Sequence, residues 1–349
     1  MTQENRIVAS EAVFSEKKVE LSGRPVNFIE FYGQKKIISK LKVFIQATLI
    51  REEVLDHVLL SGPPGLGKTT LANIVAAELG VSIRVITGPS LDRPGDLASI
   101  LTNLTKGEVL FIDEIHRLNI AVEEMLYSVM EDFRLDIIIG KGPSARTVSL
   151  SIPQFTLIGA TTMSGKVSKP LRNRFGVPLR LEYYSDDEIV QILEAAAIKL
   201  GFSLNSNAAA RLGTCSRGTP RIAIRLLRRI RDFASIKKTT VIDLEIVETG
   251  LKALEIDSIG LDSLDRKIMS TMINDFDGGP VSLDTIAAMI GEDSETIYEV
   301  YEPFLIMHSF IRRTPRGRIV TPKTYKHLGY KLKEKTVKKN TKQSELFKE

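Results

Sequence analysis

A glycine-rich stretch in the first quarter of the chain has the residue types that phosphate binding requires. Residues 62–69 read Gly-Pro-Pro-Gly-Leu-Gly-Lys-Thr, between a short apolar run and an apolar helical pattern. Glycines let backbone N–H groups converge on phosphate oxygens, and a helix N-terminus adds partial positive charge. The pattern predicts a P-loop for a nucleoside triphosphate, in which Lys68 binds the β- and γ-phosphates and Thr69 holds Mg²⁺. The nucleotide-binding residues predicted here are Gly62, Gly65, Gly67, Lys68, Thr69 and Thr70.

Two adjacent carboxylates follow a run of β-forming residues. Asp113 and Glu114 come directly after Val-Leu-Phe-Ile at 109–112, which indicates a buried parallel strand with both acids at its carboxyl end. Ligands bind at this end of open α/β sheets. We expect Asp113 to hold Mg²⁺ through a water and Glu114 to polarise the attacking water as a general base. Either motif alone would fit a turn or strand end without a ligand, but together they favour ATP hydrolysis.

The composition excludes several classes of protein. The 349 residues are 43% hydrophobic, enough for two or three domains with cores, and the net charge of +5 is compatible with nucleic acid without establishing it. The single cysteine, Cys215, rules out an internal disulfide, and the four histidines lack metal-ligand spacing. No apolar run has the length of a transmembrane helix, and the N-terminal residues do not resemble a signal peptide. We therefore expect a cytoplasmic protein with no membrane partner.

Strands and helices alternate as far as residue 182, which predicts an α/β fold with a parallel sheet and helices on both faces. The expected elements are an amphipathic helix at 34–51 and strands at 57–60, 83–87, 109–112 and 154–160. A β-hairpin at about 135–150, with a Gly-Lys-Gly-Pro turn, is inserted before the last strand. Its surplus of apolar side chains indicates either packing on its own domain or an arm that docks a partner.

The pattern from 183 to 256 is wholly helical and predicts a small helical domain. One helix should begin after Thr219, a favourable N-cap, with Pro220 in the first helical position. Arg221 lies in the first turn of that helix, where the helix dipole disfavours a cation. This placement indicates an anion nearby, and nucleotide phosphate is the obvious candidate.

The pattern from 257 to 330 predicts three helices followed by a basic strand–turn–strand, which is the plan of a winged helix. The helices are expected at 262–276, at 282–290 and from Ser294 toward His308. Any one arginine would fit a solvated turn, but four near the turn favour a polyanion: Arg312, Arg313, Arg316 and Arg318. The predicted divisions are a flexible N-terminus at 1–20, an ATPase domain at 21–182, a helical lid at 183–256, a winged-helix domain at 257–331 and a basic, disordered tail at 332–349.

Two further motifs fit an AAA+ ATPase. Gly-Ala-Thr-Thr at 159–162 ends a strand expected beside Asp113, where Thr162 could order the attacking water. An arginine projected from Pro-Leu-Arg-Asn-Arg-Phe at 170–175 resembles an arginine finger that reaches the ATP of a neighbouring subunit.

From about Arg24 to Gly329 the chain resembles the RuvB family, the bacterial motors of Holliday-junction branch migration. Ile-Gly-Lys-Gly-Pro-Ser-Ala-Arg at 139–146 and Arg-Thr-Pro-Arg-Gly-Arg at 313–318 are the most distinctive stretches. Departures from the family pattern at Gly23, Met163, Ser164, Val167, Ser168 and Asn173 remove no catalytic group. The other stretches that carry the resemblance are 60–72, 110–118, 130–136 and 216–221.

The resemblance implies a homo-hexameric ring that encircles duplex DNA and drives branch migration of Holliday junctions with ATP and Mg²⁺. It also implies that RuvA docks on the hairpin at about 135–150 and that the protein is functionally linked to the RuvC resolvase. The roles it implies are nucleotide contact for Arg24 and Tyr184, proximity to an interface nucleotide for Glu131, Asp132 and Phe133, an arginine finger for Arg174, a second sensor for Arg221, and DNA contact for Arg313, Arg316 and Arg318.

Two other functions fit many of the same residues. A clamp-loader subunit or similar AAA+ machine usually has a Ser-Arg-Cys finger motif, whereas this chain has Arg-Asn-Arg-Phe at 172–175 and a basic wing. An ATP-gated DNA-binding switch that does not translocate would share every active-site residue. A P-loop kinase is disfavoured, because no second phosphate-acceptor pocket is evident.

Overall fold

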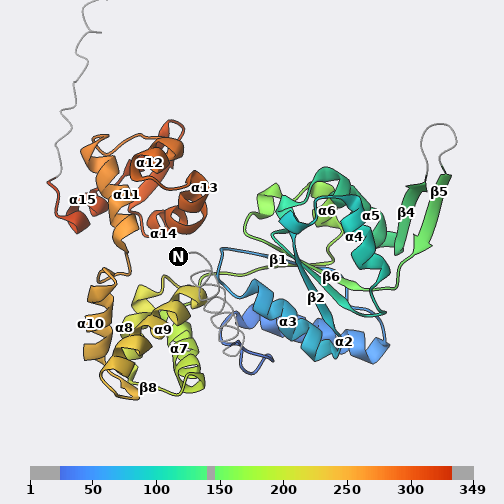
Figure 1. Ribbon diagram of the computed structural model, residues 1–349, viewed down its shortest axis with the longest axis horizontal. Coiled ribbons are helices and arrows are strands. Elements are labelled where there is room, and N and C mark those ends of the chain that lie inside the picture. Colours follow the sequence, from blue (N-terminus) through green and yellow to red (C-terminus); the bar gives the residue numbers. More distant parts are fainter. Residues whose placement is uncertain (1–23, 140–145, 332–349) are drawn as a thin grey trace, which may run out of the picture. The chain divides into compact units, whose positions relative to one another are not determined.

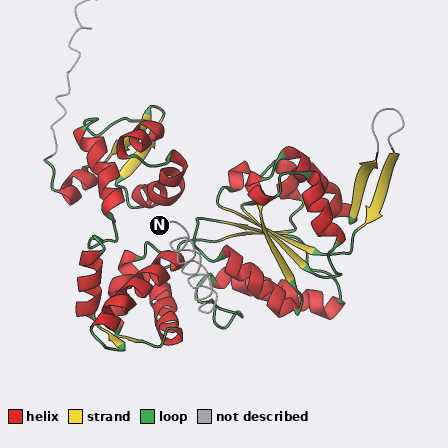
Figure 2. Ribbon diagram, in the orientation of Figure 1, coloured by secondary structure: helices red, strands yellow, loops and turns green. Residues whose placement is uncertain are grey.

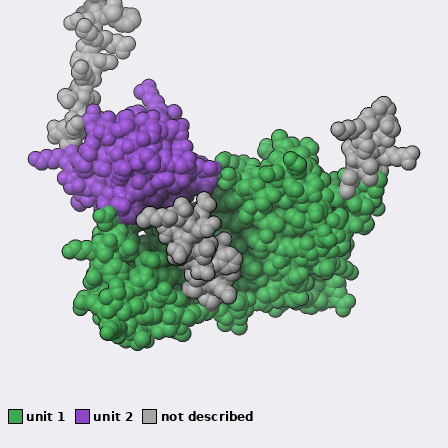
Figure 3. All heavy atoms as spheres, viewed as in Figure 1, with its two compact units in different colours: residues 1–260 green, residues 261–349 purple. Residues whose placement is uncertain are grey.

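The computed structural model describes residues 24–139 and 146–331 and divides the chain into two compact units (Figure 3). Unit 1 extends to Gly260 and unit 2 begins at Leu261. The segments expected to be flexible at 1–20 and 332–349, and the Gly-Lys-Gly-Pro turn at 140–143, lie outside the described residues. Within the described part, no helix combines the length and apolar character that a membrane crossing requires.

A five-stranded parallel sheet forms the centre of unit 1, which confirms the predicted fold class (Figure 2). Its edge strand next to β1 was not expected from the sequence. That strand contains Pro178, which is tolerated at a sheet edge but weakens a strand pattern. In the order β2-β3-β6-β1-β7, the strands are β2 (Ile83–Thr87), β3 (Val109–Asp113), β6 (Thr156–Thr161), β1 (Val58–Ser61) and β7 (Val177–Arg180).

Helices cover both faces of this sheet (Figure 1). Successive strand residues point to opposite faces, so Leu60 and Phe111 join one core while Leu59 and Leu110 join the other. The first core contains α2 (Lys35–Arg51) and α3 (Lys68–Leu79); the second contains α4 (Pro94–Thr102), α5 (Ile120–Asp132) and α6 (Lys169–Asn173). Short 3₁₀ turns η1 (Gly88–Ser90), η2 (Ile115–Arg117) and η4 (Ser164–Lys166) connect these elements.

An antiparallel hairpin projects from this sheet domain (Figure 1). It consists of β4 (Arg134–Ile139) and β5 (Arg146–Ser151), with Leu135 opposite Leu150. Leu135 is buried at the base of the hairpin, whereas Val148 and Leu150 are 39% and 37% exposed. Packing on its own domain therefore covers only part of the apolar surface.

The remainder of unit 1 is a lid of four helices, α7 (Asp186–Lys199), α8 (Ser206–Cys215), α9 (Pro220–Ile236) and α10 (Leu244–Ala253). The expectation of a wholly helical segment is wrong, because β8 (Ser203–Leu204) pairs in parallel with β9 (Val241–Ile242). Strands of two residues have no periodicity that a sequence could show. The expected capping by Thr219 is also absent, since its hydroxyl donates to the carbonyl of Arg217 at 3.2 Å.

Unit 2 has a winged-helix arrangement. The regular helix expected from Ser294 toward His308 is interrupted by a π-helical turn, η5 (Ile297–Tyr301), which ends two residues before Pro303, a residue with no N–H to donate. Val281 forms an isolated β-bridge with the wing by exchanging two backbone hydrogen bonds with Arg318, and a final helix was not expected. The elements are α11 (Ser263–Asn274), α12 (Leu283–Ile290), α13 (Ser294–Thr296), α14 (Glu302–Met307), β10 (Ile311–Thr314), β11 (Gly317–Val320) and α15 (Pro322–Leu328).

Candidate active site

Parallel pairing brings three functional segments to one edge of the sheet. β6 lies between β3 and β1, and all three strands run in the same direction. β1 leads into residues 62–69, β3 ends in Asp113 and Glu114 follows it, and Thr162 follows β6. The structure therefore places the predicted P-loop, the two acids and the predicted sensor threonine side by side.

The loop at 62–69 has a conformation that only glycine adopts easily at several positions. Gly62 and Gly65 have φ values of 144° and 78°. A Cβ on Gly62 would lie 2.6 Å from the carbonyl oxygen of Leu181, and one on Gly65 would lie 2.8 Å from a Thr219 methyl carbon. The buried Lys68 ammonium donates to the carbonyl oxygens of Gly62 (2.8 Å) and Pro63 (3.0 Å). The lysine is thus held beneath the loop, and Thr70 lies in the first turn of α3.

The residues at the predicted metal position fit a hard cation. The Thr69 hydroxyl donates to an Asp113 carboxylate oxygen at 3.2 Å, so an oxygen ligand from the first turn of α3 meets one from the end of β3. Mg²⁺ prefers a few protein oxygens supplemented by water and phosphate oxygens. Thr69 and Asp113 would hold it on the side of the P-loop that faces β3.

Glu114 is held by its neighbours. Its carboxylate accepts hydrogen bonds from the Thr162 N–H (3.3 Å) and hydroxyl (3.1 Å) and lies 3.2 Å from Nδ1 of His116. Burial favours a higher pKa for Glu114, but hydrogen bonding with His116 and Thr162 prevails and lowers that pKa. The carboxylate is therefore ionised at neutral pH, which is the form a general base needs.

His116 is a site residue that was not predicted from the sequence. Its side chain is only 3% exposed, and Nδ1 also lies 3.0 Å from the Thr161 hydroxyl. The turn η2 places the ring beside the end of β6, so the buried His116 holds Glu114 through Nδ1. Its position two residues after the acid pair was the only signal in the sequence.

The lid contacts the P-loop directly. The backbone N–H of Arg221 donates to the carbonyl of Gly65 at 3.3 Å, so the first turn of α9 lies against the loop. The Tyr184 hydroxyl donates to the carbonyl of Leu66 at 3.0 Å, and burial raises the pKa of Tyr184, which keeps this donor protonated. Arg24 is exposed, and its carbonyl accepts from Lys199 at 3.5 Å.

Arg174 contacts residues of its own domain. Its guanidinium pairs with Glu131 at 3.1 Å and lies 4.5 Å from the ring centre of Tyr127. Phe133 packs beside His57 and Phe155, while Asp132 ends α5 as an exposed residue. Arg174 and the residues predicted to lie near an interface nucleotide therefore form one neighbourhood around the end of α5.

The wing arginines are not equivalent. Arg313 and Arg318 both donate to the carboxylate of Glu302, at distances from 2.6 to 3.3 Å. The Glu302 side chain is 1% exposed, and burial tends to raise its pKa, but hydrogen bonds from the two arginines lower it below the ordinary 4.5. Arg312 and Arg316 are exposed. Glu302 was not predicted from the sequence, because its partners are 11 and 16 residues away.

The sheet-edge site, the lid and the winged helix together define an AAA+ P-loop ATPase with a DNA-binding type of C-terminal unit. The family models that match are the Holliday junction DNA helicase RuvB P-loop domain at 23–181, the RuvB AAA lid domain at 184–257 and the RuvB C-terminal winged helix domain at 258–329. The chain belongs to the RuvB family, which confirms the resemblance seen in the sequence.

Solved structures agree with this assignment. The chain is 49% identical to the Thermotoga maritima RuvB Holliday junction branch migration motor, with a TM-score of 0.82 over 89% of this chain and 100% of that one. A point variant of the RuvB from the same organism gives 50% identity and a TM-score of 0.83, covering 89% of this chain and 99% of the other. The similarity thus extends over the whole length of the relatives.

Replacing Glu114 tests its role as the base. Glu114→Gln keeps the shape and the contact with Thr162 but cannot accept a proton. We expect ATP binding to persist and kcat for hydrolysis to fall about 100-fold or more. Steady-state phosphate release and titration with a fluorescent ATP analogue would measure the two effects. Glu124→Gln, exposed on α5, is the control; undiminished turnover by Glu114→Gln would remove Glu114 from this role.

Replacing Glu302 tests the ion cluster of the wing. Glu302→Gln leaves two arginines facing a neutral, buried amide, which should destabilise unit 2 by about 3 kcal/mol. Amide hydrogen exchange in β10 and β11 should accelerate, while the exposed control Glu295→Gln should not change it. Because the folded pKa of Glu302 is lowered, its contribution exists above about 4.5 and is lost as pH falls through the folded pKa. Equal protection in both variants would contradict this.

Proposed function

We propose that this chain is a cytoplasmic, ATP-driven motor that works as a hexamer on duplex DNA and moves the branch point of Holliday junctions. The observation that carries the proposal is that one RuvB-family chain contains both a P-loop site, which a lid contacts, and a winged-helix unit. The 49% identical Thermotoga maritima protein is described as a Holliday junction branch migration motor.

The proposed chemistry is attack of water on the γ-phosphate of ATP. Mg²⁺ held by Thr69 and Asp113 would offset negative charge on the β- and γ-phosphate oxygens. Lys68 would exchange its two backbone carbonyl partners for phosphate oxygens. Ionised Glu114 would take a proton from the water as its oxygen bonds to phosphorus and the bond to ADP breaks. Thr162, already hydrogen-bonded to Glu114, is placed to orient that water.

The positions of two arginines support a shared active site. Arg221 approaches the P-loop of its own chain through Gly65. Arg174 instead pairs with Glu131 at the end of α5, so we assign it to the nucleotide of a neighbouring subunit, with Glu131, Asp132 and Phe133 beside that interface. We assign Tyr184 and Arg24 to the nucleotide of their own chain, Tyr184 through its contact with the P-loop.

Two surfaces would serve the DNA and the partner protein. Exposed Val148 and Leu150 on the projecting hairpin give RuvA an apolar docking strip. On the wing, Arg316 is free to approach the DNA backbone, and Glu302 fixes the direction of Arg313 and Arg318 while leaving Arg313 47% exposed. Contacts with phosphates carry no sequence preference, which suits a motor that moves over any sequence. We link the product, a migrated junction, to cleavage by the RuvC resolvase.

ATP-dependent dissociation of a synthetic four-way DNA junction, with and without RuvA, tests the proposed function. We expect movement that requires ATP and increases when RuvA is added. DNA-stimulated ATP turnover without junction movement would contradict the motor and favour an ATP-gated switch or another AAA+ role.

A mixing experiment tests the shared site. Arg174→Ala and Lys68→Ala should each abolish turnover, the first with ATP binding largely kept. Mixed rings contain some interfaces with an intact P-loop and an intact finger, so part of the ATPase activity should return. Phosphate release from the mixture would be measured after native mass spectrometry confirms mixed assembly. Mixed rings without recovered activity would rule out a finger supplied by the neighbour.

A further inference from the structure

One short loop of the lid contacts two functionally different parts of unit 1. This loop, residues 216–219, connects α8 to α9 and ends beside the P-loop. At that end the N–H of Arg221 donates to Gly65, and the carbonyl of Gly218 accepts from the N–H of Tyr184 at 2.9 Å. The P-loop is therefore hydrogen-bonded to the start of α9, directly after this loop, and Tyr184, whose hydroxyl donates to Leu66 of the P-loop, is hydrogen-bonded to the loop itself. A shift of the P-loop would reach residues 216–219 through Arg221 and Tyr184.

The other end of the same loop holds the segment through which the chain leaves unit 1. Nε of Arg217 donates to the carbonyl of Gly260, the last residue of unit 1, at 2.9 Å. Arg217 is only 8% exposed, so this is a buried, charge-assisted hydrogen bond. The backbone of Gly260 packs so closely on Cys215 that a Cβ there would lie 2.6 Å from the Cys215 carbonyl oxygen.

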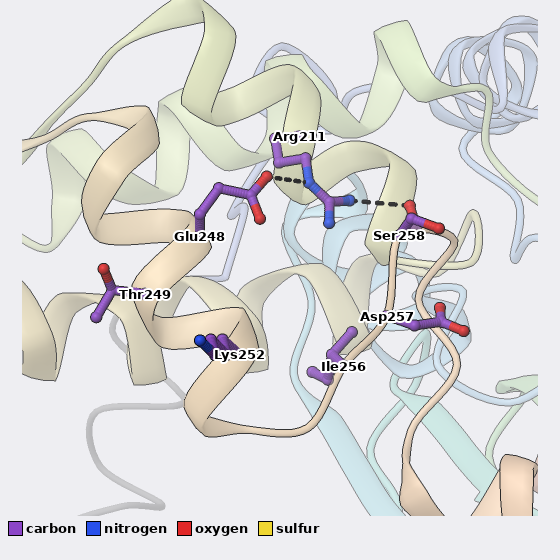
Figure 4. A pocket seen from close by; sticks show the side chains of 7 residues that line it. All are labelled: Arg211, Glu248, Thr249, Lys252, Ile256, Asp257 and Ser258. Carbon is purple, nitrogen blue, oxygen red and sulfur yellow. Dashed lines mark hydrogen bonds and ion pairs between the residues drawn. The ribbon is translucent and has the colours of Figure 1, made fainter.

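A second arginine holds the same exit segment. Arg211 on α8 pairs with Glu248 on α10 at 2.6 Å and donates to the carbonyl of Ser258 at 3.0 Å (Figure 4). The Cys215 thiol lies 3.7 Å from the carbonyl of Asp257. Residues 257–260 are therefore bound to the lid through backbone carbonyls by three side chains from α8 and the loop that follows it.

The conformation of Arg217 also indicates a constrained position. Its φ is +58°, a left-handed value that is strained for a non-glycine residue. Such a conformation persists only where the surroundings fix it, and here the Gly260 carbonyl is one identified partner of the side chain. The strained residue is thus the one whose side chain holds the exit segment, four residues before the P-loop contact of Arg221.

We propose that Arg217 is a positioning residue that couples the nucleotide state of the P-loop to the direction in which the chain leaves the lid. When nucleotide binding or hydrolysis shifts the lid, Arg217 would move residues 257–260 with it and so change the path of the chain that leads to the DNA-binding unit. The inference rests on the proposed function and goes further, because it names the residue that connects hydrolysis to DNA movement without contacting nucleotide or DNA.

Arg217→Gln tests the coupling, with the exposed Arg225→Gln on α9 as the matched control. Without DNA, ATPase activity should stay within about twofold of wild type for both. The number of base pairs migrated per ATP hydrolysed should fall about fivefold or more for Arg217→Gln alone, and Arg217→Lys should recover part of it. An unchanged ratio, or a loss of basal ATPase activity equal to that of Lys68→Ala, would overturn the proposal.

Gly260→Ala disturbs the same contact between Arg217 and residues 257–260 at the Gly260 end, and Gly201→Ala is its control. Gly201 also has a positive φ, but no atom lies within 4 Å of its Cβ position. We expect Gly260→Ala, but not Gly201→Ala, to lower the number of base pairs migrated per ATP hydrolysed. An unchanged ratio for Gly260→Ala would contradict the proposed coupling.

Hydrogen exchange separates failure of this inference from failure of the motor function. A non-hydrolysable ATP analogue should change the exchange of amides 257–260 about fivefold in the wild type but not in Arg217→Gln. This result would support the coupling even if junctions did not move. An equal change in exchange in both proteins would overturn the coupling even if junctions moved.

Discussion

The order of three parallel strands is the constraint on which the rest of this structure depends. Because β6 lies between β3 and β1 and pairs in parallel with both, the carboxyl ends of all three strands lie side by side at the same end of the sheet. The strands are buried on both faces by two separate cores, so none of them can slip by one residue without exchanging its core side chains. The positions of Lys68, Asp113, Glu114 and Thr162 follow from that register.

The polar groups at this edge are already paired within the protein. Lys68 donates to loop carbonyls, Thr69 to Asp113, and Thr162 to Glu114. Each pair satisfies a group that would be costly to leave unpaired, and each has a partner that a nucleotide, a cation or a water can replace. Binding is thus an exchange of hydrogen bonds in a preformed frame, and the lid, which contacts the same loop, is placed to respond to that exchange.

Local motifs could be predicted from the sequence, whereas tertiary partnerships could not. The P-loop and the acids after β3 depend on contiguous residues, and so do the helix boundaries near Gly291 and the hairpin strands. The edge strand with Pro178, the β8–β9 pair and the contact of His116 with Glu114 depend on residues brought together by folding. The wing is an example: its four arginines could be predicted from the sequence, but the buried Glu302 that binds two of them could not.

The central claim is that this edge of the sheet binds Mg²⁺ and ATP through the P-loop. Titration of a fluorescent ATP analogue in the presence of Mg²⁺ tests it most directly, on the wild type and on Lys68→Ala. The account predicts saturable binding by the wild type and an affinity at least about tenfold weaker for the variant, since a buried charge-assisted contact is lost. Equal affinities would show that the nucleotide binds elsewhere and would contradict the account.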